Sequence, residues 1–314
     1  MFIEAIILFI GLAILIKSSE LSILYSVRLS KFLGISQMAI GFLLIAVITS
    51  LPELSIAVIS GIQGEGLISI GNLMGSNIVN ICLIFGVVSM LVTIRCARND
   101  YKELLRSISI TSVVALVMIL LGKIGFLFGM FSLITFVLFF YSIYKNHYRL
   151  KTKRLTYRGL RTVAFIKTLF YTIVSIGLVL ISSKFVTDAA ISISQIIGIS
   201  ETIVGATILA TGTSLPELAI SITAIKRKNY SLAVGDIIGS LVTNMTLILG
   251  ITAMLGPIII DSATVFLALM LLIVNMIFLF MTSAMKCSRW QGIILIGVFF
   301  AFILAMVNYQ IFFI

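Results

Sequence analysis

Long apolar segments follow one another along almost the whole chain, and only short polar stretches separate them. A membrane-spanning helix needs about 20 mostly apolar residues, and segments of that length recur throughout. We expect ten helices, at residues 2–24, 37–61, 67–94, 107–124, 126–144, 165–186, 199–225, 231–255, 259–283 and 291–311. The pattern therefore predicts an all-α polytopic membrane protein with ten transmembrane helices.

Polar side chains interrupt this pattern twice in the same way. The motif Thr-Ser-Leu-Pro-Glu ends at Glu53 and occurs again, ending at Glu217. A second pair of motifs keeps the same offset of 164 residues, because Gly-Asn…Gly-Ser…Asn over 71–80 matches Gly-Asp…Gly-Ser…Asn over 235–244. The chain is thus an internal duplication, and its intramembrane polar residues belong to the duplicated part.

The duplication divides the chain into two halves of five helices. We expect a first repeat over residues 1–144, a basic linker over 145–164 and a second repeat over 165–314. Because five is odd, the second repeat enters the membrane in the opposite sense from the first. The two Thr-Ser-Leu-Pro-Glu motifs then run antiparallel and can meet near the middle of the bilayer.

The composition agrees with a membrane protein, and the distribution of the basic residues predicts its orientation. The chain is 61% hydrophobic and 11% charged, with a mean hydropathy of +1.25 and a net charge of +11. With the N-terminus outside, every Lys and Arg except Lys123 and Lys184 falls on an inside loop. The positive-inside rule then places both termini outside and the basic segment 145–167 in the cytoplasm, in a multi-pass protein of the cytoplasmic membrane. The positive charge is a topology signal, so we expect no nucleic-acid binding.

Three acids fall deep in the predicted helices: Glu53, Glu217 and Asp236. A charged side chain at the bilayer centre costs about 2.5–3.5 kcal/mol on insertion scales, and such residues are functional by default. Proline at 52 and 216 removes a backbone donor before each glutamate and frees carbonyl oxygens. Carboxylate, hydroxyl, amide and carbonyl oxygens are hard ligands that suit Ca²⁺ or Na⁺, and they do not suit zinc or copper.

The spacing of the motif residues indicates how they could cooperate. Thr49 and Ser50 precede Glu53 by four and three positions, so all three can face one way on a helical surface; Thr213, Ser214 and Glu217 repeat this. In the neighbouring helices polar residues recur every fourth position, at Asn72, Ser76 and Asn80 and at Asp236, Ser240 and Asn244. Coupled exchange requires that the two ions exclude each other from the site. A single site that holds either Ca²⁺ or several Na⁺ at overlapping positions would meet this requirement.

These motifs resemble the α-repeats of the cation/calcium exchanger superfamily, in particular its prokaryotic sodium/calcium exchanger branch, over essentially the whole chain. The resemblance implies inverted five-helix repeats and a central cluster of four ion sites. It implies that Glu53 and Glu217 bind both Ca²⁺ and Na⁺ and that helices 1 and 6 slide to switch access. The other implied ligands are Thr49 and Thr213 for Ca²⁺, Ser50, Ser76, Ser214, Ser240 and the carbonyls of Ala46 and Ala210 for Na⁺, and Asn80 and Asn244 for the middle site.

Three residues depart from the family pattern. Asn244 stands where potassium-dependent relatives often have Asp, which argues against K⁺ co-transport. Asp236 replaces the usual Asn, and ion binding competes with a capping or water-facing role for it. Ile48 replaces a Gly that usually precedes Thr-Ser.

Several functions compete at this stage. The leading one is Na⁺/Ca²⁺ antiport, with Ca²⁺ and Na⁺ as transported ions, no cofactor, no enzyme activity, the lipid bilayer as the surroundings and a monomer as the working unit. H⁺/Ca²⁺ exchange or other cation exchange on the same fold is the first alternative, and a cation channel is the second. An intramembrane hydrolase lacks a nucleophile and base pair. The structural alternative is a protonated or hydrogen-bonded glutamate pair that locks the repeats together.

Overall fold

The computed structural model describes residues 2–33, 36–62, 64, 66–95, 98–147, 160–197, 210–283 and 286–313. Within these ranges the chain is almost entirely helical, and seven helices are long and apolar enough to cross a membrane, or eight if one bent pair counts as a single span. The all-α, multi-pass character predicted from hydropathy is confirmed. Most of the predicted linker and the start of the predicted span at 199–225 lie outside the described residues.

The two halves of the chain contain matching series of elements. The first half consists of α1 (Phe2–Leu33), α2 (Gln37–Ile40), η1 (Gly41–Ile45), α3 (Ala46–Thr49), α4 (Leu51–Ile62), α5 (Gly66–Ile78), η2 (Val79–Ile84), α6 (Phe85–Leu91), β1 (Ile94–Arg95), α7 (Arg98–Leu121), β2 (Lys123–Ile124) and α8 (Phe126–His147). The second half consists of α9 (Leu160–Ile197), α11 (Ala210–Thr213), α12 (Leu215–Lys226), α13 (Tyr230–Val242), η4 (Thr243–Ile248), α14 (Leu249–Leu255), β3 (Ile258–Ile259), α15 (Ser262–Thr282), β4 (Lys286–Cys287) and α16 (Arg289–Phe313). The η elements are π-helical turns inside otherwise continuous helices.

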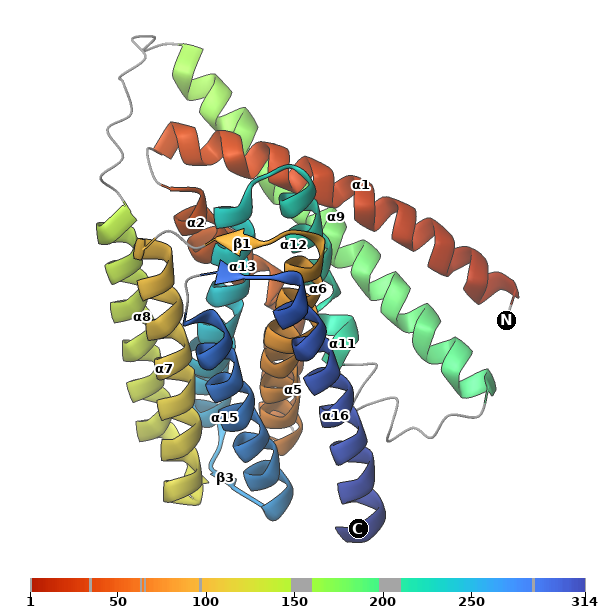
Figure 1. The fold of residues 1–314 in the computed structure, drawn as a ribbon, viewed down its shortest axis with the longest axis vertical. Coiled ribbons are helices and arrows are strands. Elements are labelled where there is room, and N and C mark those ends of the chain that lie inside the picture. Colours follow the sequence, from red (N-terminus) through yellow and green to blue (C-terminus); the bar gives the residue numbers. More distant parts are fainter. Residues whose placement is uncertain are drawn as a thin grey trace.

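Two continuous spans form the centre of the molecule. These are residues 66–91 (α5, η2 and α6) and 230–255 (α13, η4 and α14), and 83% of the most apolar window of each is buried. The corresponding share is only 39% for α7 and α15 and 22% for α8 and α16, so these helices form the outer layer. Figure 1 shows α7 and α8 along one side of the bundle and α15 and α16 in front of it. The polar stripes of the sequence thus lie on the helices that are most enclosed by protein.

The helices α1 and α9 are longer than their predicted spans of 2–24 and 165–186. They have 32 and 38 residues, which is about 48 and 57 Å at 1.5 Å per residue and well beyond a hydrocarbon core of about 30 Å. Each helix therefore continues beyond its predicted apolar span, and Figure 1 shows the pair side by side, slanting across the bundle. Tyr25 stacks on Tyr171 at 5.0 Å and Phe32 meets Phe165 edge-on at 6.1 Å, so aromatic packing continues the pair past the apolar core.

Four two-residue strands, which hydropathy does not predict, join the halves reciprocally. Ile94 in β1 pairs with Cys287 in β4, and Lys123 in β2 pairs with Ile259 in β3. Each half therefore gives its first strand to the second strand of the other. A buried hydrogen bond repeats this relation, because Asn275 Nδ2 donates to Thr111 Oγ1 at 3.2 Å across the same 164-residue offset.

Glycine allows the central helices of the two halves to touch through their backbones. A Cβ at Gly239 in α13 would lie 2.5 Å from Cβ of Ala46 and 2.9 Å from Cα of Phe42, and one at Gly235 would meet the carbonyl of Met38. Small residues permit such approach between membrane helices. The glycines of α13 thus set the distance between the two polar motifs.

We predict that Gly239→Ala destabilises the protein, because the added methyl group forces backbone apart; overpacking of this kind costs about 1–3 kcal/mol. The matched control is Gly297→Ala in α16, where a Cβ would meet nothing within 4 Å. Thermal unfolding of both variants in detergent, followed by size-exclusion chromatography, measures the effect. Equal melting temperatures for the two variants would contradict this account.

Candidate intramembrane cation site

Each Thr-Ser-Leu-Pro-Glu motif lies at a break between two helices. The helices α3 and α4 meet at Ser50 (φ −81°, ψ 12°), and α11 and α12 meet at Ser214 (φ −89°, ψ 5°). Pro52 and Pro216 lack the amide hydrogen that a continuous helix needs, and their rings clash with the preceding turn. The breaks therefore lie at equivalent positions of the two halves and present the motif side chains to the interior.

The two glutamates accept hydrogen bonds from serine hydroxyls of both halves. Ser50 and Ser240 donate to Oε1 of Glu217 at 3.5 and 3.4 Å, and Ser76 donates to Oε1 of Glu53 at 3.4 Å. Both carboxylates are 1% exposed and interact with each other electrostatically. These O···O distances are long for hydrogen bonds, which fits oxygen atoms that surround a common space.

The expectation that Ser50 shares a helical surface with its own glutamate is wrong. Ser50 contacts Glu217 of the other half, and Ser76 links Glu53 with Thr213 of the other half, since the Ser76 and Thr213 hydroxyls lie 3.5 Å apart. The reason is the break at Ser50, because the i, i+3 relation holds only within one continuous helix. The site is therefore built by hydroxyls that cross between the halves.

The carbonyls of Ala46 and Ala210 lie beside the motif hydroxyls. Thr49 Oγ1 is 3.2 Å from the Ala46 oxygen, and Thr213 Oγ1 and Ser214 Oγ are each 3.2 Å from the Ala210 oxygen. Two oxygens about 3 Å apart have the spacing of neighbouring ligands around one cation. Each hydroxyl can thus either donate a hydrogen bond to the carbonyl or turn away from it, so that both oxygens bind one cation.

Several buried oxygen atoms without a hydrogen-bond partner lie on the two broken helices and on the two central spans. In the described part of the chain these include Oε2 of Glu53 and of Glu217 and Oδ1 of Asn80 and of Asn244. Each of these residues is 1% exposed. Buried acceptors are normally paired, so four such atoms in symmetric positions point to a ligand that supplies positive charge.

Asn77 belongs to the site although the sequence motifs did not select it. Asn244 Nδ2 donates to Asn77 Oδ1 at 3.1 Å, and Asn77 Nδ2 donates to the Leu241 carbonyl at 3.2 Å, which fixes both amides. The search for duplicated polar residues missed Asn77 because its counterpart is Leu241. Its position beside Ser76 in the Gly-Ser-Asn run was the available signal.

Asp236 lies one helical turn away from this centre. It is fully buried in the middle of α13 and accepts a hydrogen bond from Ser221 at 3.2 Å. Ser221 lies about one turn after Glu217 on α12, and Ser240 lies about one turn after Asp236 on α13. Since Ser221 bonds to Asp236 and Ser240 bonds to Glu217, the two carboxylates lie about one helical turn apart on these adjacent helices. The capping or water-facing role considered for Asp236 is therefore wrong, because the residue lies in the middle of α13 and is 0% exposed.

No basic side chain neutralises the central acids among the described residues. The ion pairs there involve Glu20 and Glu103, and neither Glu53 nor Glu217 takes part in one. Groups of three or more His, Cys, Asp or Glu side chains that could hold a metal are also absent from this part of the chain. Any cation held by the glutamates would therefore be completed by hydroxyl, amide and carbonyl oxygens, which are ligands for hard cations.

The fold defines a multi-pass membrane protein whose polar residues gather between two broken helices, and comparison with known proteins gives the family. Residues 3–145 and 167–308 match the family described as "Sodium/calcium exchanger protein". Since these segments make up most of the chain, it belongs to the sodium/calcium exchanger family. The unmatched stretch between them contains the basic linker.

Individual relatives cover nearly the whole chain. The sodium/calcium exchanger MaX1 of Methanosarcina acetivorans is 28% identical over 96% of this chain and 97% of its own length. The putative antiporter CaxA of Alkalimonas amylolytica is 30% identical over 84% of each protein. A structure of the sodium-calcium exchanger NCX_Mj soaked with 10 mM Na⁺ and zero Ca²⁺ superposes with a TM-score of 0.84 at 26% identity, over 96% of this chain and 97% of that one.

The crossing of hydroxyls between the halves can be tested by double-mutant cycles. We predict that Ser50→Ala and Glu217→Gln are energetically coupled, by about 0.5–1.5 kcal/mol as expected for one hydrogen bond. Ser50→Ala and Glu53→Gln should be additive by comparison. The measurement is thermal unfolding of the single and double variants in ion-free detergent, and stronger coupling of Ser50 to Glu53 would overturn the assignment.

Proposed function

We propose that the protein is a secondary antiporter that exchanges Na⁺ for Ca²⁺ across the cytoplasmic membrane by alternating access. The observation that carries this proposal is the set of unpartnered buried oxygens of Glu53, Glu217, Asn80 and Asn244. Burying two carboxylates without a partner costs several kcal/mol each, which a bound cation offsets. The family names of the relatives support Na⁺ and Ca²⁺ as the ions.

The chemistry of the site favours exchange over simple binding. One Ca²⁺ balances both glutamates and takes about 6–8 oxygens in flexible geometry, whereas Na⁺ ions have to share the charge between them. Because the two ions compete for Oε atoms of Glu53 and Glu217, they occupy the site in turn. The carbonyl oxygens of Ala46 and Ala210, with the hydroxyls beside them, would bind Na⁺. Thr49 and Thr213 would complete the coordination shell of Ca²⁺.

If the empty site cannot change its access state, transport is coupled. A doubly negative centre without an ion is costly to move through an apolar barrier. Either Ca²⁺ or Na⁺ must therefore be bound when access switches, and movement of one species in one direction requires movement of the other in return. This coupling distinguishes an antiporter from a channel and from an enzyme.

The proposed membrane architecture is ten helices in two inverted five-helix repeats. The reciprocal strand pairs and the hydrogen bond between Thr111 and Asn275 support an approximate two-fold relation between the halves. The three spans missing from the seven would be α1, the broken helices α2–α4 and the segment that contains α11 and α12. The positive-inside rule places both termini outside and residues 145–167 in the cytoplasm.

We further propose that α1 and α9 slide together across the site. Serines on α1 are buried at Ser18, Ser22, Ser26 and Ser30, and this spacing of four places them in one row. Hydroxyls such as that of Ser18 bond to carbonyls of their own helix, at 2.7 Å to Ile14. Ser30 likewise bonds to Val27, whereas the buried hydroxyls of Ser22 and Ser26 have no hydrogen-bond partner in the described part of the chain. None of the four serines therefore bonds to another helix there, so α1 can shift without breaking hydrogen bonds of this row to its neighbours.

Transport in proteoliposomes tests the function directly. We expect ⁴⁵Ca²⁺ uptake into sodium-loaded vesicles when external Na⁺ is absent, and collapse of that uptake when Na⁺ is equal on both sides. Uptake driven by a proton gradient and insensitive to Na⁺ would select H⁺/Ca²⁺ exchange instead. Conductance that needs no counter-ion would indicate a channel.

Removing one charge from the centre should abolish exchange. Glu53→Gln and Glu217→Gln each keep the side-chain volume but remove the charge that Ca²⁺ requires, so we predict loss of Na⁺-dependent uptake with unchanged elution in size-exclusion chromatography. The control is Asp261→Asn, an exposed acid at the start of α15 where Asn also caps a helix. Full transport by either glutamine variant would disprove the site.

A further inference from the structure

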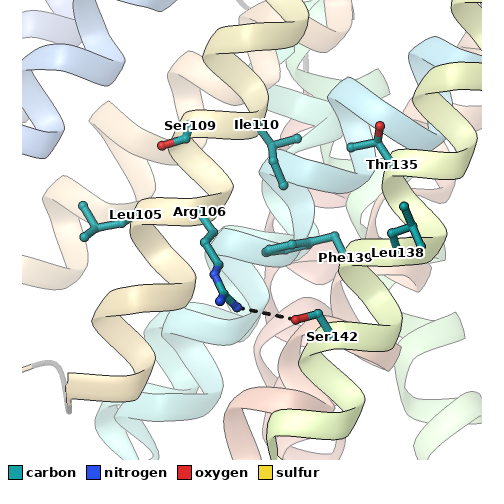
Figure 2. Close-up of a pocket in the computed structure, with 8 residues that line it drawn as sticks. All are labelled: Leu105, Arg106, Ser109, Ile110, Thr135, Leu138, Phe139 and Ser142. Carbon is teal, nitrogen blue, oxygen red and sulfur yellow. Dashed lines mark hydrogen bonds between the residues drawn. The ribbon is translucent and has the colours of Figure 1, made fainter.

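A groove runs between the outer helices α7 and α8, away from the cation site. It has a volume of about 490 Å³ and faces outward beside exposed residues of α8 such as Val137. Figure 2 shows the side chains that line it, which are Leu105, Arg106, Ser109, Ile110, Thr135, Leu138, Phe139 and Ser142. The groove is therefore mostly apolar, with hydroxyl groups along its length and a guanidinium at one end.

A smaller polar cavity of about 270 Å³ continues from that end and shares the arginine. It is lined by Asn99, Lys102, Glu103, Arg106 and Asn146. Two of these side chains carry positive charge and one carries negative charge, so the cavity has one net positive charge. An apolar groove thus leads into a small, positively charged chamber.

Hydrogen bonds fix the arginine in place. Nη1 of Arg106 donates to both carboxylate oxygens of Glu103, at 3.2 and 3.3 Å, and to Ser142 at 3.5 Å. Asn146 Nδ2 also donates to Glu103, at 3.1 Å. Within the described chain all hydrogen bonds of Arg106 run through Nη1, so Nη2 and Nε remain available for a ligand.

The position of the two spaces along the membrane matches an amphipathic molecule. The polar cavity lies where α7 begins and α8 ends, close to Arg98 and His147, and the groove extends from it toward the middle of both helices. From Ser142 to Thr135 the groove covers seven residues, or about 10 Å. Beyond the polar bridges, α7 and α8 make little direct contact in the part of the chain that the structure describes, which leaves the groove unfilled by protein.

We propose that this is a binding site for an anionic phospholipid. The phosphodiester would lie in the polar cavity against Arg106 and Lys102, and one acyl chain would fill the groove over Leu138 and Ile110. Arg is suited to bidentate contact with phosphate oxygens, and the single net charge matches a monoanionic headgroup. Basic pockets between membrane helices on the cytoplasmic side bind such headgroups, and the orientation proposed for this protein puts the cavity there.

Occupancy by lipid would connect the outer layer with the core. The helices α7 and α8 both contact η4, and α8 also contacts α14, so a lipid that joins them would hold them against the central span. We therefore expect the bound lipid to raise the thermal stability of the whole protein. This inference rests on the membrane fold, on the proposed orientation and on the two cavities, and it does not depend on which ions are exchanged.

Native mass spectrometry of the purified protein in detergent, titrated with phosphatidylglycerol or phosphatidylcholine, tests the proposal. We expect one tightly bound phosphatidylglycerol, a higher melting temperature with it, and at least fivefold weaker binding by Arg106→Gln, as expected for loss of one basic contact. The charge-matched control is Lys123→Gln, which lies at the opposite end of α7 and should bind as the unchanged protein does.

A second pair of variants tests the acyl groove without changing charge. Leu138→Trp should fill the groove and weaken phosphatidylglycerol binding, whereas Val137→Trp, on the neighbouring exposed position, should not. Equal affinity for phosphatidylcholine or phosphatidylethanolamine, or full binding by Arg106→Gln, would overturn the proposal. Competition by glycerol phosphate as strong as that by the lipid would also overturn it, because a free phosphate compound would then be the ligand.

Discussion

Two carboxylates held together inside the membrane, without a basic partner among the described residues, are the constraint on which this structure depends. Glu53 and Glu217 are buried beside one another, and each has one oxygen that accepts from serine and one that accepts from nothing in the described chain. Such an arrangement is unfavourable unless a bound cation or protonation neutralises it. The helix breaks, the close glycine contacts and the enclosing outer helices all serve to bring these oxygens to one place and to keep lipid away from them.

The duplication of the chain explains why the site is nearly symmetric. Each half supplies one broken helix and one polar stripe, and the hydroxyls cross so that Ser50 meets Glu217 while Ser76 links Glu53 to Thr213. The symmetry is incomplete, because the residue equivalent to Asn77 in the second repeat is Leu241, and the residue equivalent to Asn72 is Asp236. The first half thus supplies an extra amide near Asn244, and the second half supplies an extra carboxylate near Glu217, so the two halves of the site differ in their chemistry.

The surroundings of the central spans divide into two parts. The aromatic contacts between α1 and α9 tie these two tilted helices into one unit, whereas α7, α8, α15 and α16 are joined to the core through reciprocal strands and buried polar bonds. The polar bridge between Glu103, Arg106 and Asn146 lies in this outer layer. Its position at a helix end explains how a buried acid is tolerated there: the arginine reaches it from the interface.

The sequence by itself determined the membrane class, the duplication and the choice of Glu53 and Glu217, because hydropathy, a constant offset and the cost of intramembrane charge are local properties of the chain. It also located the helix breaks through Pro52 and Pro216. Only the tertiary structure decided which hydroxyl meets which carboxylate, that Asn77 joins the site and that α1 and α9 extend beyond their apolar cores. Those features depend on contacts between residues far apart in the chain, and spacing within one helix carries no information about what lies across a break.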